Sequence, residues 1–322
     1  MSRYSRVIGT GGYLPEEVRT NEQISQTVDT SDSWIFERTG IKSRRIAGAD
    51  ETASSMAEIA ARQAIEAAAC DPEEIDLIIV TTGTPDRVYP STGCLLQWRL
   101  GIKNCVAFDV QAACSGSIFA LNIADQYIKS GAANKVLVVG SEICSRLVDW
   151  TDRGTCILFG DGAGAVLLAA SDDAGILSTH IHSDGEFEDL LYCPNPQAAT
   201  EANKNEVGYI SMRGNEVFKV AVNTLGRIVD ETLAANNMQQ SDVDWLVPHQ
   251  ANTRIIAATA KKLKMSMDHV ILTLENQGNT SSASVLLALN EGIRDGRIQR
   301  GQVVLLEAFG AGFTWGSALI KY

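Results

Sequence analysis

The sequence has no excess of positive charge. Its 322 residues include 27 Lys and Arg against 39 Asp and Glu, which gives a formal net charge of −12 with His neutral. Proteins that bind nucleic acid or anionic membranes need a positive surface for their phosphate contacts. Both classes of partner are therefore disfavoured, although a local basic patch is compatible with this charge.

Long apolar stretches are also missing. No apolar run reaches the roughly 18 residues that a membrane-spanning helix needs. The opening residues, MSRYSRVIGTGGYLPEEV, contain neither a long apolar core nor a small-residue cleavage site, so no secretory signal is expected. We therefore expect no membrane span and a cytoplasmic location.

Cysteine and histidine are too scattered for a structural metal site. The 7 cysteines form no CxxC pair, and the 4 histidines are not clustered with them at the short spacing that zinc sites use. His180 and His182 are expected on one solvated face of a strand. The GTGG string at 9–12 is followed by Pro15 and not by a helix, so it is not a dinucleotide fingerprint. No metal and no cofactor are predicted.

The sequence does contain alternating strands and helices. Continuous apolar runs predict buried strands, and longer patterns of helical period predict helices. The expected strands are 75–82, 135–142, 165–171, 243–250 and 302–310, and the expected helices are 54–70, 115–131, 215–237 and 282–296. Ser54 or Ser55 and Asn215 are candidate N-caps. This alternation predicts an α/β fold with largely parallel sheets.

A weak internal repeat divides the chain. The segment AIEAAACDPEEIDLIIVTTG recurs as TLAANNMQQSDVDWLVPHQ, so that Asp76 aligns with Asp244. Such self-similarity indicates a duplicated α/β unit. The predicted halves are residues 1–172 and 173–322, and the polar stretch 183–210 is expected to be a loop or insertion.

Three side chains at junctions between strands and helices are candidates for chemistry. Cys114 begins a helical pattern in DVQAACSG, where a helix dipole can lower a thiol pKa, and the alternative is a small core thiol. His249 follows a strand in WLVPHQANTR, where α/β folds bind ligands, and the alternative is a histidine bonded to a loop carbonyl. Asn279 lies in the Gly-rich turn LENQGNTSSAS, which could equally be plain turn chemistry.

Together these motifs resemble the β-ketoacyl-[acyl-carrier-protein] synthases III, the condensing enzymes that initiate bacterial fatty acid synthesis. The likeness runs from GTGGYLP to FGAGFTWGSALIKY and includes TSDSWIFERTGIKSRRIA, DVQAACSG, DRGTCILFGDGAGA, PHQANTRI and GNTSSAS in family order. The resemblance implies a thiolase-like fold of two α/β halves in an αβαβα arrangement. The first half would carry the nucleophilic cysteine, and the second the histidine and asparagine.

The resemblance also implies a two-stage reaction. Cys114 would take the acetyl group from acetyl-coenzyme A, and malonyl-acyl carrier protein would then lose CO2 and condense with it to give acetoacetyl-acyl carrier protein. His249 and Asn279 would stabilise the enolate by hydrogen bonds. The backbone N–H groups of Cys114 and Ala311 would form a second oxyanion hole. Ala311 stands where the family has glycine, so its φ must suit an alanine without strain.

Further positions match binding residues of the family. The coenzyme A set comprises Thr30, Trp34, Arg38, Arg153 and Asn252, and the carrier-protein set comprises Lys219, Arg254, Lys261 and Lys262. Tyr89 matches a residue, often Phe, that gates the acyl pocket across a homodimer interface. The alternatives are a partly buried Trp, a surface salt bridge and a solvated helical face. Coenzyme A thioester is a substrate here and not a cofactor.

The sequence has features that bear on several other functions. A relative could use a branched-chain or medium-chain acyl primer with the same chemistry. A true thiolase needs a second cysteine near the C-terminal turn, which FGAGFTWG lacks, and an elongating synthase has a second histidine where this chain has Asn279. A Cys-His-Asn hydrolase is the alternative from another class, and a non-catalytic scaffold would be expected to lose one of the three residues.

Overall fold

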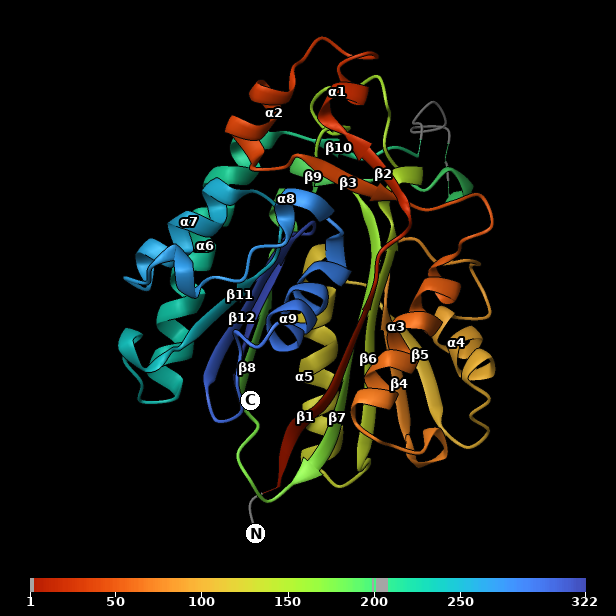
Figure 1. Ribbon diagram of the computed structural model, residues 1–322, viewed down its shortest axis with the longest axis vertical. Helices are drawn as coiled ribbons and strands as arrows, with labels where there is room; N and C mark the ends of the chain where they lie inside the picture. The colour runs from red at the N-terminus through yellow and green to blue at the C-terminus, as the bar shows by residue number, and fades with distance from the viewer. Residues whose placement is uncertain (1–2, 199, 201–207) are drawn as a thin grey trace.

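The computed structural model describes residues 3–198, 200 and 208–322. The chain forms five layers in the order helices, sheet, helices, sheet, helices (Figure 1). This is the αβαβα arrangement that the sequence predicted. Both sheets pack against a shared central pair of helices, and the largest apolar cluster fills the space around that pair.

Each half of the chain contributes one main sheet. The first has the spatial order β1 (Tyr4–Tyr13), β7 (Asp161–Ser171), β6 (Lys135–Ile143), β4 (Leu77–Thr81) and β5 (Val106–Val110). The second has the order β11 (Trp245–Pro248), β12 (Val303–Gly310), β13 (Thr314–Lys321) and β8 (Ile176–Ser183). All five residues of β4 are buried, as a continuous apolar run predicts for a strand covered on both faces.

The helices take three positions relative to the sheets. The central pair is α5 (Gly116–Lys129) and α9 (Ser284–Arg294), the outer pair on the first sheet is α3 (Ala53–Ala67) and α4 (Thr92–Leu100), and the outer pair on the second is α6 (Gly214–Ala235) and α7 (Thr253–Lys262). The 3-10 turns η2 (Ala113–Ser115) and η8 (Ser281–Ala283) lead into α5 and α9.

Shorter elements cover one end of these layers, at the top of Figure 1. They are β2 (Glu17–Thr20), α1 (Asn21–Ile24), α2 (Asp32–Thr39), β3 (Ser43–Ile46), β9 (Leu191–Tyr192), β10 (Ser211–Met212) and α8 (Leu274–Gln277). In the segment expected to be a loop, β9 pairs with β10, while residues 199 and 201–207 lie outside the described residues.

The backbone carries a trace of the duplication. Ala69 and Asn237 have φ of 48° and 52°, and Ala113 and Ser281 have φ of 45° and 49°. Each pair is separated by 168 residues, as are Asp76 and Asp244. These left-handed conformations are uncommon outside glycine, so their recurrence at one offset indicates that the two halves share a backbone path.

Two sequence expectations are wrong. The sheets are not largely parallel, because β7 runs antiparallel to β1 and β6, and β13 runs antiparallel to β12 and β8. Apolar patterning reports burial and not strand direction, and the short link between β12 and β13 makes a hairpin. The N-cap of α3 is Thr52 and that of α6 is Arg213, whose side chain makes no capping bond.

Candidate active site

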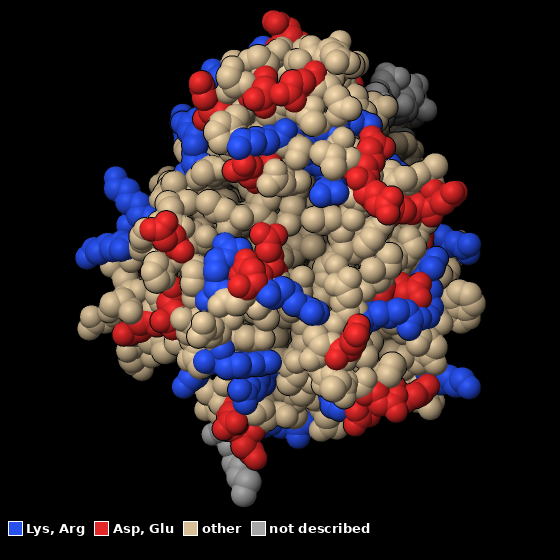
Figure 2. Space-filling model, viewed as in Figure 1, with Lys and Arg blue, Asp and Glu red and all other residues tan. Residues whose placement is uncertain are grey.

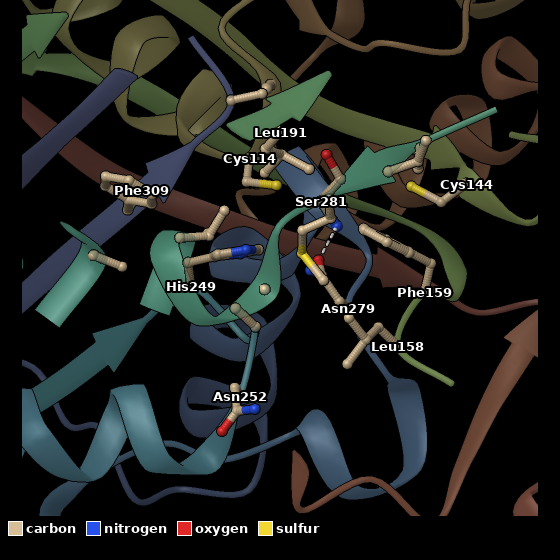
Figure 3. Close-up of a pocket in the computed structure, with 18 of the residues that line it drawn as sticks. Cys114, Cys144, Leu158, Phe159, Leu191, His249, Asn252, Asn279, Ser281 and Phe309 are labelled. Atoms are coloured by element: carbon tan, nitrogen blue, oxygen red, sulfur yellow. Dashed lines mark hydrogen bonds between the residues drawn. The ribbon is translucent and has the colours of Figure 1, made fainter. Parts of the chain in front are cut away.

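A cavity of about 480 Å³ is lined by residues of both halves, including Cys114, His249 and Asn279. Cys114 lies in η2 at the start of α5, His249 follows β11, and Asn279 precedes η8 and α9. Figure 3 shows these three side chains directed toward one shared space. The structure thus brings together the three side chains that the sequence singled out.

The Cys114 side chain is buried, with 8% exposure. Burial raises the pKa of its thiol to about 12, although the Ser281 hydroxyl lowers this pKa and the nearby Glu142 carboxyl raises it. The expectation of a thiol with a lowered pKa is therefore wrong, because the loss of solvent outweighs the position at a helix start. A nucleophile in this state needs a group that takes its proton.

His249 is held as a neutral imidazole. Burial lowers the pKa of its ring to about 4. The ring Nδ1 lies 2.6 Å from Ser284 Oγ, and the backbone N–H of His249 donates to the carbonyl of Glu307 at 2.8 Å. If Ser284 donates to Nδ1, then Nε2 carries the ring proton and is the donor available to a ligand.

Asn279 is fixed by the first half of the chain. Its backbone N–H donates to Leu158 O at 2.9 Å, and its carbonyl accepts from Gly160 N at 3.0 Å. Its side-chain Oδ1 accepts the backbone N–H of Ser281 at 2.8 Å, drawn as the dashed line in Figure 3. With the oxygen engaged in this way, the amide NH2 remains as a donor for a ligand.

The turn after β12 approaches the backbone of the nucleophile. A Cβ added at Gly310 would lie 2.6 Å from Cys114 N, so only glycine permits this approach. Ala311 lines the cavity beside it. The positive φ in this turn, 137°, belongs to Gly312 and not to Ala311. Alanine at 311 therefore introduces no left-handed strain.

The comparisons with known proteins identify the family. Residues 108–185 match the family described as 3-oxoacyl-[acyl-carrier-protein (ACP)] synthase III, and residues 233–322 match its C-terminal region. The β-ketoacyl-[acyl-carrier-protein] synthase III of Methylococcus capsulatus is 68% identical over the full length of both chains. That of Thioalkalivibrio sulfidiphilus is 59% identical over 99% of both.

The crystal structure of 3-oxoacyl-[acyl-carrier-protein] synthase III from Aquifex aeolicus superposes with a TM-score of 0.94, at 48% identity, over 99% of this chain and 100% of that one. The chain belongs to this family. It is an initiating condensing enzyme of fatty acid synthesis and an acyltransferase. The thiolase-like fold predicted from its sequence is confirmed.

In this synthase, the residues matched to coenzyme A binding fall into two groups. Arg38 and Asn252 line the cavity, whereas Thr30, Trp34 and Arg153 lie outside its lining. The guanidinium carbons of Arg38 and Arg153 lie 4.1 Å and 4.8 Å from the centre of the Trp34 ring. Thr30 has a buried hydroxyl with no hydrogen-bond partner among the described residues.

The synthase also presents its predicted carrier-protein residues on α6 and α7. Arg254 lines the cavity and stacks over the Phe218 ring at 5.2 Å, and the Lys219 and Lys261 side chains are exposed. The ammonium of Lys262 is 2.6 Å from an Asp230 carboxylate oxygen. Over the face shown in Figure 2, basic and acidic side chains are interspersed.

Tyr89 lies outside the cavity lining of the single chain and is 82% exposed.

Among the described residues, no cluster of three or more His, Cys, Asp or Glu is arranged to hold a metal ion. Within the same residues, every helix is too short or too polar to cross a membrane. On β8 of the second sheet, His180 and His182 both contact Glu231 of α6, at 3.2 Å and 2.9 Å.

Sequence reasoning missed three residues that position the site. Ser284 contacts His249, Ser281 contacts Asn279 and Cys114, and the buried Glu142 lines the cavity. The concentration of small hydroxyl residues in GNTSSAS was the available signal for the two serines. Glu142 ends an apolar strand pattern. Because a carboxyl group is seldom buried, its position there was the available signal for a functional residue.

Proposed function

We propose that this synthase transfers an acetyl group from acetyl-coenzyme A to Cys114 and then condenses it with malonyl-acyl carrier protein. The products are coenzyme A, CO2 and acetoacetyl-acyl carrier protein. The observation that supports this assignment is the convergence of a buried thiol, a neutral histidine and an asparagine amide on one cavity.

In the first stage, the Cys114 sulfur attacks the thioester carbonyl, and coenzyme A leaves as its thiol. The developing oxyanion needs donors that are fixed before the reaction. The backbone N–H groups of Cys114 and Ala311 are the candidates, since Gly310 brings this turn against the Cys114 nitrogen. Backbone donors of this kind depend on the path of the chain and not on the side chain at 311.

In the second stage, the malonyl group loses CO2 and its carbanion attacks the acyl-Cys114 carbonyl. The enolate oxygen takes hydrogen bonds from His249 Nε2 and the Asn279 amide. A histidine with a pKa near 4 stays neutral at physiological pH. It therefore donates a hydrogen bond to the enolate without protonating it, and the electron pair remains available for carbon–carbon bond formation.

The cavity mouth suits a long phosphorylated thioester. Arg38, Asn252 and Arg254 line it, and the Trp34 ring stacks with Arg38 and Arg153 close by. We assign the adenine of coenzyme A to Trp34 and Arg153, with Thr30 in the same pocket. We assign the binding of an acidic carrier protein to Lys219, Arg254 and Lys261. Lys262 can contribute to this binding only after its salt bridge with Asp230 breaks.

We further propose that the synthase is a homodimer joined through the edge strand β5 and the segment before it. The apolar side chains of Val88, Tyr89, Trp98 and Val106 are 73%, 82%, 79% and 57% exposed. A group of exposed apolar residues beside an open sheet edge is a typical interface. Pairing there would cover Tyr89 and allow it to gate the acyl pocket of the other subunit.

The test of this function is the mass of the intact protein after mixing with acetyl-coenzyme A, followed by peptide mapping. We expect an acetyl adduct on Cys114, which malonyl-acyl carrier protein then discharges as acetoacetyl-carrier. Cys114→Ser should abolish acetyl transfer. An adduct that forms only with longer or branched acyl-coenzyme A would show that the primer is that acyl group and not acetyl. Acetyl transfer at the wild-type rate by C114S would refute the assignment.

A further inference from the structure

The thiol of Cys114 must lose a proton before it attacks, and its surroundings do not ionise it in advance. The side chain is buried, and among the described residues no Lys or Arg is one of the groups that shift the pKa of its thiol. His249 is a weak base because burial lowers the pKa of its ring to about 4. A different group near the sulfur is therefore needed to hold this proton during acyl transfer.

A buried carboxyl group lies behind the nucleophile. Glu142, in β6, is 1% exposed and reaches the wall of the cavity. One of its oxygens accepts hydrogen bonds from Ser281 Oγ at 3.2 Å and Ser282 Oγ at 2.7 Å. The other accepts from Gly83 N and Thr84 Oγ1, both at 3.0 Å. None of these partners carries a positive charge.

Two effects of unequal size act on the pKa of Glu142, and the larger one raises it. Burial raises the pKa of its carboxyl, and the hydrogen bonds from the two serines, Gly83 and Thr84 lower it. The titratable groups nearby are two thiols, that of Cys114 in η2 and that of Cys144 in the 3-10 turn η3 (Cys144–Arg146), and the Glu142 carboxyl raises the pKa of both. Neither thiol can neutralise a carboxylate. With its pKa raised, the Glu142 carboxylate binds a proton more strongly than an exposed carboxylate does.

Ser281 connects this carboxyl to the nucleophile. Its hydroxyl donates to Glu142 at 3.2 Å and lies near the Cys114 thiol, whose pKa it lowers, and both side chains line the same cavity. Its φ of 49° is unusual for a residue with a side chain, and so is the 45° of Ala113, directly before Cys114. Backbone strain of this kind persists where the surrounding structure enforces it, often at functional sites. Here one strained residue is Ser281 itself, and the other is the residue directly before Cys114.

We propose that Glu142 accepts the Cys114 proton through the Ser281 hydroxyl during acyl transfer, an inference that rests on the proposed function. The thiol proton passes to Ser281 Oγ as the serine's own proton passes to the Glu142 carboxylate. The thiolate then forms a bond to the thioester carbonyl carbon, and the bond from that carbon to the coenzyme A sulfur breaks. The proton returns by the same path to the departing coenzyme A thiolate, which leaves Glu142 ionised and Cys114 acylated.

The neighbouring serine offers a matched control. Ser282 donates to the same carboxyl oxygen of Glu142 at 2.7 Å, and its hydroxyl also contacts the carbonyl of Thr81 at 3.1 Å. It does not contribute to the pKa of Cys114. Ser281→Ala and Ser282→Ala therefore remove the same chemical group from Glu142, but only the first interrupts the path from sulfur to carboxyl.

The experiment measures the rate of acetyl transfer from acetyl-coenzyme A to Cys114 by rapid quench and intact mass, between pH 6 and 9. At neutral pH we expect S281A and Glu142→Gln to slow acylation by tenfold or more, as for loss of a proton-transfer group. S282A should stay within about threefold of wild type. The difference in acylation rate between S281A and wild type should become smaller as pH rises, because solvent then removes the thiol proton of Cys114 directly.

Three results would overturn the relay while leaving the proposed function standing. The first is an equal slowing of acetyl transfer in S281A and S282A. The second is a wild-type rate of acetyl transfer in S281A or in E142Q. The third is a slowing of acetyl transfer in S281A that does not depend on pH. If wild-type protein forms no adduct on Cys114, then the proposed function itself fails.

Discussion

At His249, a single contact determines which ring nitrogen faces the substrate. The 2.6 Å approach of Ser284 Oγ to Nδ1 favours a proton on Nε2 if the serine donates. Gln250 N lies 3.4 Å from the same hydroxyl oxygen and can donate to it, so the serine's own proton is free to point at the ring. The histidine then enters the reaction already oriented as a donor.

Ser284→Ala tests this orientation. The variant should decarboxylate malonyl-acyl carrier protein about tenfold or more slowly, because the ring loses the partner that fixes its tautomer. Acetyl transfer to Cys114 should be almost unchanged. The two rates are measured separately, by CO2 release and by intact mass. Equal slowing of both steps would contradict a role specific to the enolate.

At the scale of one element, Asn252 both begins a helix and ties it to a neighbour. Its Oδ1 accepts the N–H of Arg254 as the N-cap of α7, and its Nδ2 donates to Arg38 O at the end of α2, each at 2.9 Å. Both polar atoms of the side chain are therefore engaged within the protein. Asn252 also lines the cavity, so it can act on coenzyme A through the second N–H of its amide as well as through the position of Arg38.

A pair of substitutions separates these two contacts. Asn252→Asp keeps a cap acceptor, so its free energy of unfolding in urea should remain close to wild type. Asn252→Ala should lose about 1 kcal/mol. Both variants lack the donor to Arg38 and should raise KM for acetyl-coenzyme A. A wild-type KM in both variants would show that the hydrogen bond from Asn252 to Arg38 O has no part in binding acetyl-coenzyme A.

The limits of sequence reasoning are clearest at this scale. The strand β12 and the helix α5 were predictable because apolar spacing reports burial. The strand β13 was not predicted, because its antiparallel pairing depends on the three-residue turn before it, which could be interpreted from sequence either as an oxyanion site or as a plain tight turn. Similarly, Cys114 was predictable as a nucleophile from its motif. Its raised pKa was not, because burial arises from segments distant in sequence.

At the scale of the whole molecule, the apolar surface beside β5 predicts self-association. Trp98→Glu, which introduces a charge at the 79% exposed Trp98, should convert dimers to monomers in sedimentation experiments. Tyr127→Glu, at an exposed aromatic residue on α5, is the control and should leave the assembly intact. If W98E remains dimeric, the interface lies elsewhere.

A buried carboxyl group should also make stability depend on pH. Glu307 in β12 is 1% exposed, and burial raises the pKa of its carboxyl to about 8 against a smaller lowering by Thr259. Neither of its oxygens has a hydrogen bond of good geometry to the described residues. Between about pH 4.5 and 8 the folded state keeps a proton that the unfolded state has lost, so stability falls as pH rises.

Glu307→Gln removes this titration. At about 1.4 kcal/mol per pKa unit, the decline in wild-type stability from pH 5 to 8 should reach a few kcal/mol, and the variant should show a clearly smaller decline in urea unfolding. His249 acts in the opposite direction, since its lowered pKa costs stability as pH falls below about 6.5. An unchanged slope in E307Q would contradict the assignment.

The position of the last strand has a consequence for synthesis on the ribosome. β13, which spans Thr314–Lys321, lies between β12 and β8, so β8 has no neighbour in its sheet until these residues have been made. The Gly310 turn and the support for His249 also come from this late segment. A nascent or prematurely terminated chain would carry Cys114 without a closed cavity around it. The reactive thiol therefore acquires its setting only after β12 and β13 have been translated.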